Sequence, residues 1–183
     1  MQRGIAMDRA WLEQQLAEFP LYLYEFIHTS ELIFTERVRH ICRTECPMYG
    51  KSWACPPAVG EVEACKARCM AFDEALLIST ITEVSDIANI DETLATRAPH
   101  EEITRRIHEL VRSQARETMV LSTEACAHCE HCTYPGAPCR FPDKMYPCVE
   151  SHGILVTDLA ERHGIDFMNG NLVTWFSLIF FRE

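Results

Sequence analysis

The sequence has few basic residues and none of the short motifs that mark common enzymes. It contains 17 Lys and Arg against 27 Asp and Glu, which gives a net charge of −10. No stripe of basic residues is present that would bind a phosphate backbone, so we expect no nucleic-acid partner. A Ser-His-Asp order, a glycine-rich phosphate loop and an HExxH motif are all missing. Hydrolase and nucleotide-binding functions therefore have no support in the sequence.

Long apolar segments are also missing. The longest run, Leu172 to Phe181, is interrupted by Thr174 and Ser177, and it is about half of the roughly 20 residues that a membrane-spanning helix needs. The N-terminal residues, Met1 to Asp8, become charged before any apolar stretch develops, which is not typical of a secretory signal. We expect a soluble, cytoplasmic protein that does not bind membranes.

The composition is that of an ordinary globular domain. The chain has 183 residues, of which 48% are hydrophobic and 24% are charged, as in average folded proteins. This length allows a substantial core but is short for two independent domains. We therefore predict a single domain over residues 1–183.

Hydrophobic periodicity predicts helices and strands in mixed order. The strands expected are Leu21 to Ile27, Ala75 to Ile81 and Leu172 to Phe181, and the last should be buried on both faces because it is apolar throughout. These elements predict an α+β fold, or an α/β fold, with a single small mixed sheet and flanking helices. The helices expected run from Asp8 to Phe19, from a Thr29-Ser30-Glu31 cap towards Ile41, from Glu61 to Phe72, from Pro99 to Val120 and from Val149 to His163.

Ten cysteines depart from the average composition. In the cytoplasm cysteines are kept reduced, so we interpret them first as metal ligands or reactive thiols. They gather in two segments, 42–69 and 126–148. Prolines and glycines prevent regular structure in the second segment and in the first as far as Gly60, whereas Cys65 and Cys69 fall on the helix expected from Glu61.

The second segment carries the stronger signal. Its C-x2-C-x2-C spacing puts three thiolates on one tight turn, as in ferredoxins that bind a [4Fe-4S] cluster. The predicted ligands are Cys126, Cys129, Cys132 and Cys139, with Cys148 in reserve as the fourth. Zinc is the alternative, because one C-x2-C pair with two further Cys or His residues also makes a structural zinc site. A redox disulfide is a third, weaker interpretation.

The first segment has C-x3-C-x8-C spacing with two Cys-Pro steps, which is compatible with a second cluster. The predicted ligands are Cys42, Cys46, Cys55 and Cys65, with Cys69 in reserve. Both Cys65 and Cys69 have a simpler alternative as small buried side chains on a helix face. We expect the two segments to lie close together, and a Cys-Pro cysteine such as Cys55 could ligate the cluster of the other segment.

The chain also resembles a family of cysteine-rich predicted metal-binding proteins, a domain-of-unknown-function family found mainly in anaerobes. The resemblance rests on Cys46 to Pro57, on Cys126 to Pro142 and on Glu150 to Ile154. It implies two metal or iron-sulfur sites and a link to anaerobic redox metabolism, and it implies no particular reaction.

Together these features predict an iron-sulfur protein with two [4Fe-4S] clusters that exchanges electrons with a partner enzyme. Its acidic charge suits docking to a basic redox partner. Two alternatives remain open: a zinc-stabilised structural or interaction protein, and an enzyme that acts on a small molecule through an incompletely ligated cluster.

Overall fold

The computed structural model describes residues 7–165 and 169–183. Within these residues four strands form one sheet in the order β1-β2-β4-β3, and every pairing between them is antiparallel. The α+β prediction is confirmed, whereas the sheet is antiparallel and not mixed. The strands are β1 (Leu23–His28), β2 (Glu74–Glu83), β3 (Glu117–Leu121) and β4 (Leu172–Arg182).

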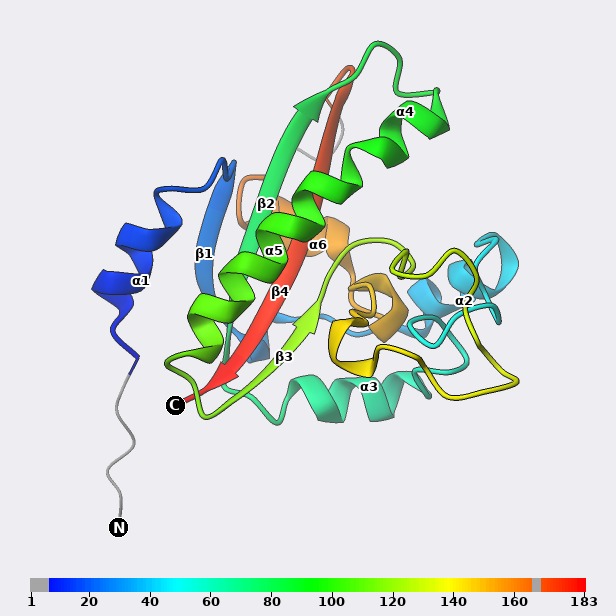
Figure 1. The fold of residues 1–183 in the computed structure, drawn as a ribbon, viewed down its shortest axis with the longest axis horizontal. Helices are drawn as coiled ribbons and strands as arrows, with labels where there is room; N and C mark the ends of the chain where they lie inside the picture. Colours follow the sequence, from blue (N-terminus) through cyan, green and yellow to red (C-terminus); the bar gives the residue numbers. More distant parts are fainter. Residues whose placement is uncertain (1–6, 166–168) are drawn as a thin grey trace.

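The two central strands, β2 and β4, are apolar on both faces because both faces are covered (Figure 1). One face packs with α1 (Arg9–Leu16) and α5 (Arg97–Arg112). The other packs with α6 (Val156–Arg162) and with the end of α3 (Val62–Cys69). Alternate residues along each strand enter opposite cores, as the period of two requires: Leu76 enters one core and Leu77 the other.

Two further helices are short: α2 (Glu36–Thr44) and α4 (Ile90–Ala95), which directly precedes α5. The hydroxyl of Thr35 accepts a hydrogen bond from the backbone N–H of Arg37 at 3.1 Å and caps α2. The cap predicted at Thr29 to Glu31 is instead a separate single turn of 3-10 helix. No helix of the described residues is long and apolar enough to cross a membrane.

The predicted helix from Pro99 to Val120 is too long. The helix α5 ends at Arg112, and Glu117 to Leu121 form the edge strand β3 beside β4. No glycine or proline marks this boundary in the sequence. The strand forms because the free edge of β4 supplies backbone partners for it, which local sequence cannot show.

The predicted helix from Val149 to His163 is interrupted at its centre. A 3-10 turn over Glu150–His152 ends at Gly153, whose φ is +77°, and α6 begins only at Val156. The residues between them are extended: the N–H of Thr35 donates to the carbonyl of Gly153 at 2.8 Å, and the N–H of Leu155 donates to that of Ile33 at 2.9 Å.

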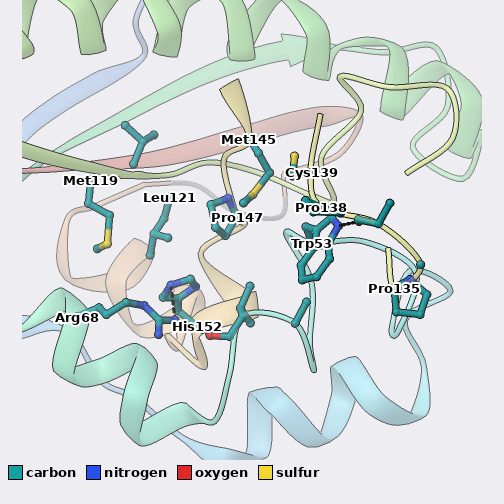
Figure 2. Close-up of a pocket in the computed structure, with 15 residues that line it drawn as sticks. Trp53, Arg68, Met119, Leu121, Pro135, Pro138, Cys139, Met145, Pro147 and His152 are labelled. Carbon is teal, nitrogen blue, oxygen red and sulfur yellow. Dashed lines mark hydrogen bonds between the residues drawn. The ribbon is translucent and has the colours of Figure 1, made fainter. Parts of the chain in front are cut away.

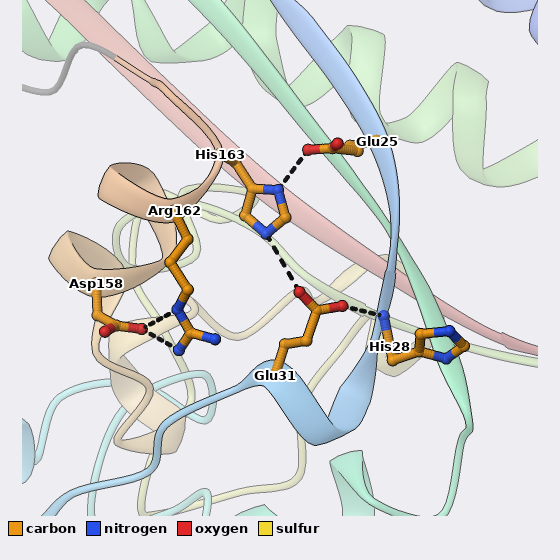
Figure 3. Close-up of polar contacts among 6 residues, drawn as sticks. All are labelled: Glu25, His28, Glu31, Asp158, Arg162 and His163. Atoms are coloured by element: carbon orange, nitrogen blue, oxygen red, sulfur yellow. Dashed lines mark hydrogen bonds and ion pairs between the residues drawn. The ribbon is translucent and has the colours of Figure 1, made fainter.

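Polar contacts connect the end of α6 to β1 and to the turn that follows β1 (Figure 3). The imidazole of His163 lies between the carboxylates of Glu25, on β1, and Glu31, with Nε2 3.8 Å from Glu31 Oε2. Glu31 also accepts a hydrogen bond from the backbone N–H of His28 at 2.7 Å. These contacts hold α6 against β1 and the turn that follows it.

Candidate metal centres

Four cysteines from the two cysteine segments line one pocket of about 210 Å³. Two carboxylates and a phenol share its wall, from Glu124, Glu150 and Tyr49. Four thiols around one space are a donor set that both a [4Fe-4S] cluster and zinc accept. The four cysteines are Cys42, Cys46, Cys55 and Cys148.

Local structure explains how these cysteines meet. Cys42 is on the last turn of α2, and turns hold the loop after it, with the N–H of Gly50 donating to the carbonyl of Pro56 at 2.8 Å. Cys148 comes from the distant segment because its neighbours pair with Ser122 at the end of β3. The N–H of Ser122 donates to the carbonyl of Pro147 at 2.8 Å, and the N–H of Val149 donates to that of Ser122 at 3.0 Å.

The electrostatics of this pocket favour a bound cation. Burial and the neighbouring Cys46 and Cys42 raise the pKa of Cys55 to about 12. Burial, and then Glu150 and Cys55, raise the pKa of Cys148 well above its usual value. The thiols of Cys55 and Cys148 therefore favour the protonated form in the absence of metal, since negative charges would accumulate without compensation. A metal ion supplies that compensation and displaces the protons.

The other four predicted ligands line a second pocket, and His128 and Arg140 lie in the same wall. This space is nearly closed, with about 20 Å³ free, which is room for about one water molecule. Burial alone would raise the pKa of Cys132, but hydrogen bonds from the backbone N–H groups of Tyr134 and Trp53 lower it. The cysteines of this pocket are Cys126, Cys129, Cys132 and Cys139.

Cys65 and Cys69 lie elsewhere. Both are fully buried on α3, and neither lines a cysteine pocket. The Cys65 sulfur accepts hydrogen bonds from Arg68 Nη2 at 3.1 Å and from Arg39 Nη2 at 3.5 Å. Cys69 belongs to the apolar core, beside Phe72. The structure therefore does not bring Cys65 to the first pocket, where Cys148 lies instead.

The two pockets are neighbours, as expected for the two segments. Trp53, from the first segment, donates its indole N–H to the carbonyl of Ala137 at 3.0 Å, and its ring meets Tyr134 edge-on at 4.9 Å between centroids. Ala125 lines the first pocket while the adjacent Cys126 lines the second.

The sequence predicts Cys148 only as a reserve fourth ligand, and it assigns this cysteine to the second pocket and not to the first. A proline also adjoins Cys148, as it does Cys46 and Cys55, although here the proline comes first. This pattern marks Cys148 as a candidate ligand but does not show which pocket it joins. The sequence analysis did not single out Glu124 and Glu150, although each stands two positions from a cysteine, Cys126 and Cys148 respectively. Glu124 has a left-handed φ of 54°, a conformation that non-glycine residues seldom adopt outside functional sites.

In the described residues no three Cys, His, Asp or Glu side chains already surround a common metal position. The thiols share pockets but must still converge on a metal. The donor sets fit metal binding: each pocket offers four sulfur ligands, and a carboxylate or an imidazole lies beside them.

A family model described as "Predicted metal-binding protein (DUF2284)" matches residues 25–181 of this chain. The match spans β1 to β4 and includes both cysteine pockets. No curated protein and no solved structure matches the chain.

Proposed function

We propose that this chain, which belongs to the DUF2284 family of predicted metal-binding proteins, holds two [4Fe-4S] clusters and exchanges single electrons with a partner protein. The supporting observation is the pocket formed by Cys42, Cys46, Cys55 and Cys148. A cubane cluster bound by four thiolates takes up and releases one electron at a time. Complete ligation favours electron transfer over catalysis at an open iron.

The chain's own residues contribute shielding and charge. Tyr49 lines the first pocket and Trp53 the second, and aromatic rings beside a cluster exclude water and change its potential. Glu124 places a carboxylate near the first cluster, which disfavours its reduced form. The neighbouring Glu150 is protonated more readily, because burial raises its pKa. Arg140 adds positive charge at the second. We therefore propose that the first cluster has the lower potential.

The proposed partner is a basic redox protein. This rests on the net charge of −10, because electrostatic attraction between oppositely charged surfaces accelerates their association. Such association weakens at high ionic strength, so the rate of electron transfer to a basic partner should fall as salt is added.

A second candidate function, a structural zinc site, has support at the second pocket only. The free space of about 20 Å³ among its cysteines accommodates one ion, whereas a cubane requires the four thiols to spread apart. A zinc ion there would make this pocket a structural site, held by tetrahedral sulfur ligands, and would leave the first pocket as the only redox centre.

Anaerobic purification followed by iron, sulfide and zinc analysis tests these proposals. Two clusters predict about eight irons and eight sulfides per chain, and a reduced sample in which electron paramagnetic resonance shows spin coupling between neighbouring clusters. About four irons with one zinc would support the second candidate. Zinc in both pockets without sulfide would refute electron transfer.

A further inference from the structure

A cavity of about 660 Å³ lies beside the second cysteine pocket, between β3, α3 and both cysteine segments (Figure 2). This volume is within the range of small-molecule sites, roughly 300–1,000 Å³. Neither of the metal centres proposed above occupies this cavity. Its apolar walls include Trp53, Met119, Leu121, Pro135, Met145 and Pro147.

Of the described residues that line this cavity, Arg68 is the one with a permanent charge. Its Nη2 donates to the carbonyl of Val59 at 2.6 Å and to the sulfur of Cys65 at 3.1 Å, and it lies 3.5 Å from Nε2 of His152. These contacts hold the guanidinium in place at the cavity wall (Figure 2). Among the described residues no carboxylate forms an ion pair with it.

A second cation increases the positive potential behind this wall. Arg39 is 5% exposed, and its Nη2 donates to the carbonyl of Ser151 at 2.7 Å and to the sulfur of Cys65 at 3.5 Å. It too lacks a carboxylate partner within the part of the chain that the structure describes. The cavity is open to solvent and Arg68 is itself exposed, so water weakens the attraction, but positive charges at and behind this wall still favour an anion over a neutral ligand.

The residues that line the cavity also limit the chemical class of ligand that it can bind. One guanidinium balances one negative charge, and it forms its best hydrogen bonds with a carboxylate, whose two oxygens match its geometry. The remaining walls are hydrocarbon, sulfur and aromatic surface, which suit an apolar body and not a sugar or a polyphosphate. Three residues, Trp53, Cys139 and Met145, line both this cavity and the second cysteine pocket, so a ligand here lies against the wall of the metal centre.

We propose that this cavity binds an apolar monocarboxylate, with its carboxylate on Arg68 and its apolar body against Trp53, Met119 and Met145. The inference goes beyond the proposed function and does not depend on which metal the cysteines hold. It adds a small-molecule site to the two proposed metal centres.

The test is titration of the anaerobically purified, metal-containing protein with 1-pyrenebutanoate and with its uncharged analogue 1-pyrenebutanol, followed by pyrene fluorescence and calorimetry. The carboxylate should bind more tightly than the alcohol. Arg68→Gln should weaken binding of the carboxylate about tenfold or more and leave the alcohol unchanged, because a charged hydrogen-bonding pair is lost. Arg68→Lys should retain part of the preference for the carboxylate over the alcohol.

Two further variants make the result specific. Lys66→Gln removes a positive charge from the same helix at an exposed position, and it should leave both affinities unchanged. Ala58→Phe adds bulk to the cavity wall while the charge of Arg68 remains, and it should weaken the binding of both probes. It tests the site independently if Arg68→Gln disturbs the contacts to Val59 and Cys65, and the metal content of each variant reports whether it has folded.

Equal affinity for both probes, or no response of the carboxylate to Arg68→Gln, would overturn the carboxylate assignment. Failure of both probes to bind a protein with full metal content would overturn the cavity as a ligand site. That result would not contradict the proposal of two metal centres, because the metal analysis tests that proposal separately.

Discussion

At the residue scale, the position of a cysteine in the fold matters more than its distance along the chain. Cys65 follows Cys55 by ten positions and Cys148 follows it by 93, yet Cys148 is the one that shares its pocket. The sulfur of Cys65 instead receives two guanidinium hydrogen bonds. A thiol in that setting organises Arg39 and Arg68 and is a poor candidate for ligation.

Replacement of Cys148 by Ala should therefore remove the first cluster. The variant lacks one of four thiolates, so its iron content should fall by about half, to about four per chain, with the sulfide content falling in parallel. Iron analysis and the absorption spectrum of anaerobically prepared protein measure this.

The matched variants are Cys65→Ala and Cys129→Ala. The first should retain full iron, and the second should lose the other cluster because it interrupts the C-x2-C-x2-C turn. Full iron in Cys148→Ala, together with loss in Cys65→Ala, would restore the ligand set predicted from the sequence.

A second residue-scale feature is a buried polar network beneath α5. His100 is fully buried, with Nδ1 2.9 Å from Thr80 Oγ1 and Nε2 2.8 Å from Ser177 Oγ. Burial lowers the pKa of His100 from its ordinary 6.5 to about 4. Its partners are neutral hydroxyls, so nothing compensates a charge on the imidazole.

Stability should consequently fall as the pH drops from about 6.5 to about 4. In that interval the unfolded chain binds a proton at His100 that the folded chain does not, so the free energy of unfolding decreases with falling pH. The difference corresponds to about 3 kcal/mol at most. Urea unfolding at several pH values measures it. In His100→Gln this part of the pH dependence should vanish, while in the exposed-site variant His40→Gln it should persist.

At the element scale, Gly153 sets the path between the 3-10 turn and α6. Its φ is +77°, and a Cβ added there would lie 3.0 Å from both γ carbons of Val62 and 3.3 Å from the carbonyl oxygen of Thr35. Val62 begins α3 and is 2% exposed, so it has little room to move. The glycine thus permits close packing of two elements that flank the cavity and the first pocket.

Gly153→Ala should be considerably more destabilising than Gly164→Ala. Both glycines have positive φ, at 77° and 63°, but nothing lies within 4 Å of a Cβ at Gly164. The left-handed conformation costs about 1–2 kcal/mol in both variants, and overpacking against Val62 adds about 1–3 kcal/mol in the first. Thermal unfolding of both variants provides the comparison. Equal losses of stability in the two variants would show that Val62 moves aside at no cost in free energy.

At the scale of the whole molecule, the sheet and the cysteine segments differ in what holds them. The strand β4 pairs with β2 and β3 along its two edges and is buried along most of its length. The cysteine segments consist mainly of turns, and their mutual contacts include one indole hydrogen bond, from Trp53 to Ala137. Metal ligands are therefore expected to supply much of the order in these segments.

Removal of metal by a chelator under reducing conditions should loosen residues 42–60 and 126–148 while the sheet persists. Hydrogen exchange should accelerate in those two ranges and remain slow in β2 and β4, because only the former depend on ligation. Reloading with iron and sulfide should restore slow exchange. Unchanged exchange in both segments would mean that the metal is dispensable for folding.

The sequence by itself determined the features that depend on short-range chemistry. The compact apolar run of Ala75 to Ile81, the continuous apolar run of Leu172 to Phe181 and the cap at Asp8 each fix a local structure. The C-x2-C-x2-C spacing likewise keeps Cys126, Cys129 and Cys132 near one another along the chain, and they line one pocket. These features predicted the α+β fold and the second set of four cysteines, because neighbours in the chain are then neighbours in space.

Only the tertiary structure decided the features that depend on contacts between distant segments. Glu117 to Leu121 became a strand because the edge of β4 was open to pairing. Cys148 entered the first pocket because Ser122 pairs with the residues on either side of it. The cavity at Arg68 exists because α3, β3 and both cysteine segments meet there. Backbone partners and side-chain neighbours of this kind are set by packing, and no local pattern encodes them.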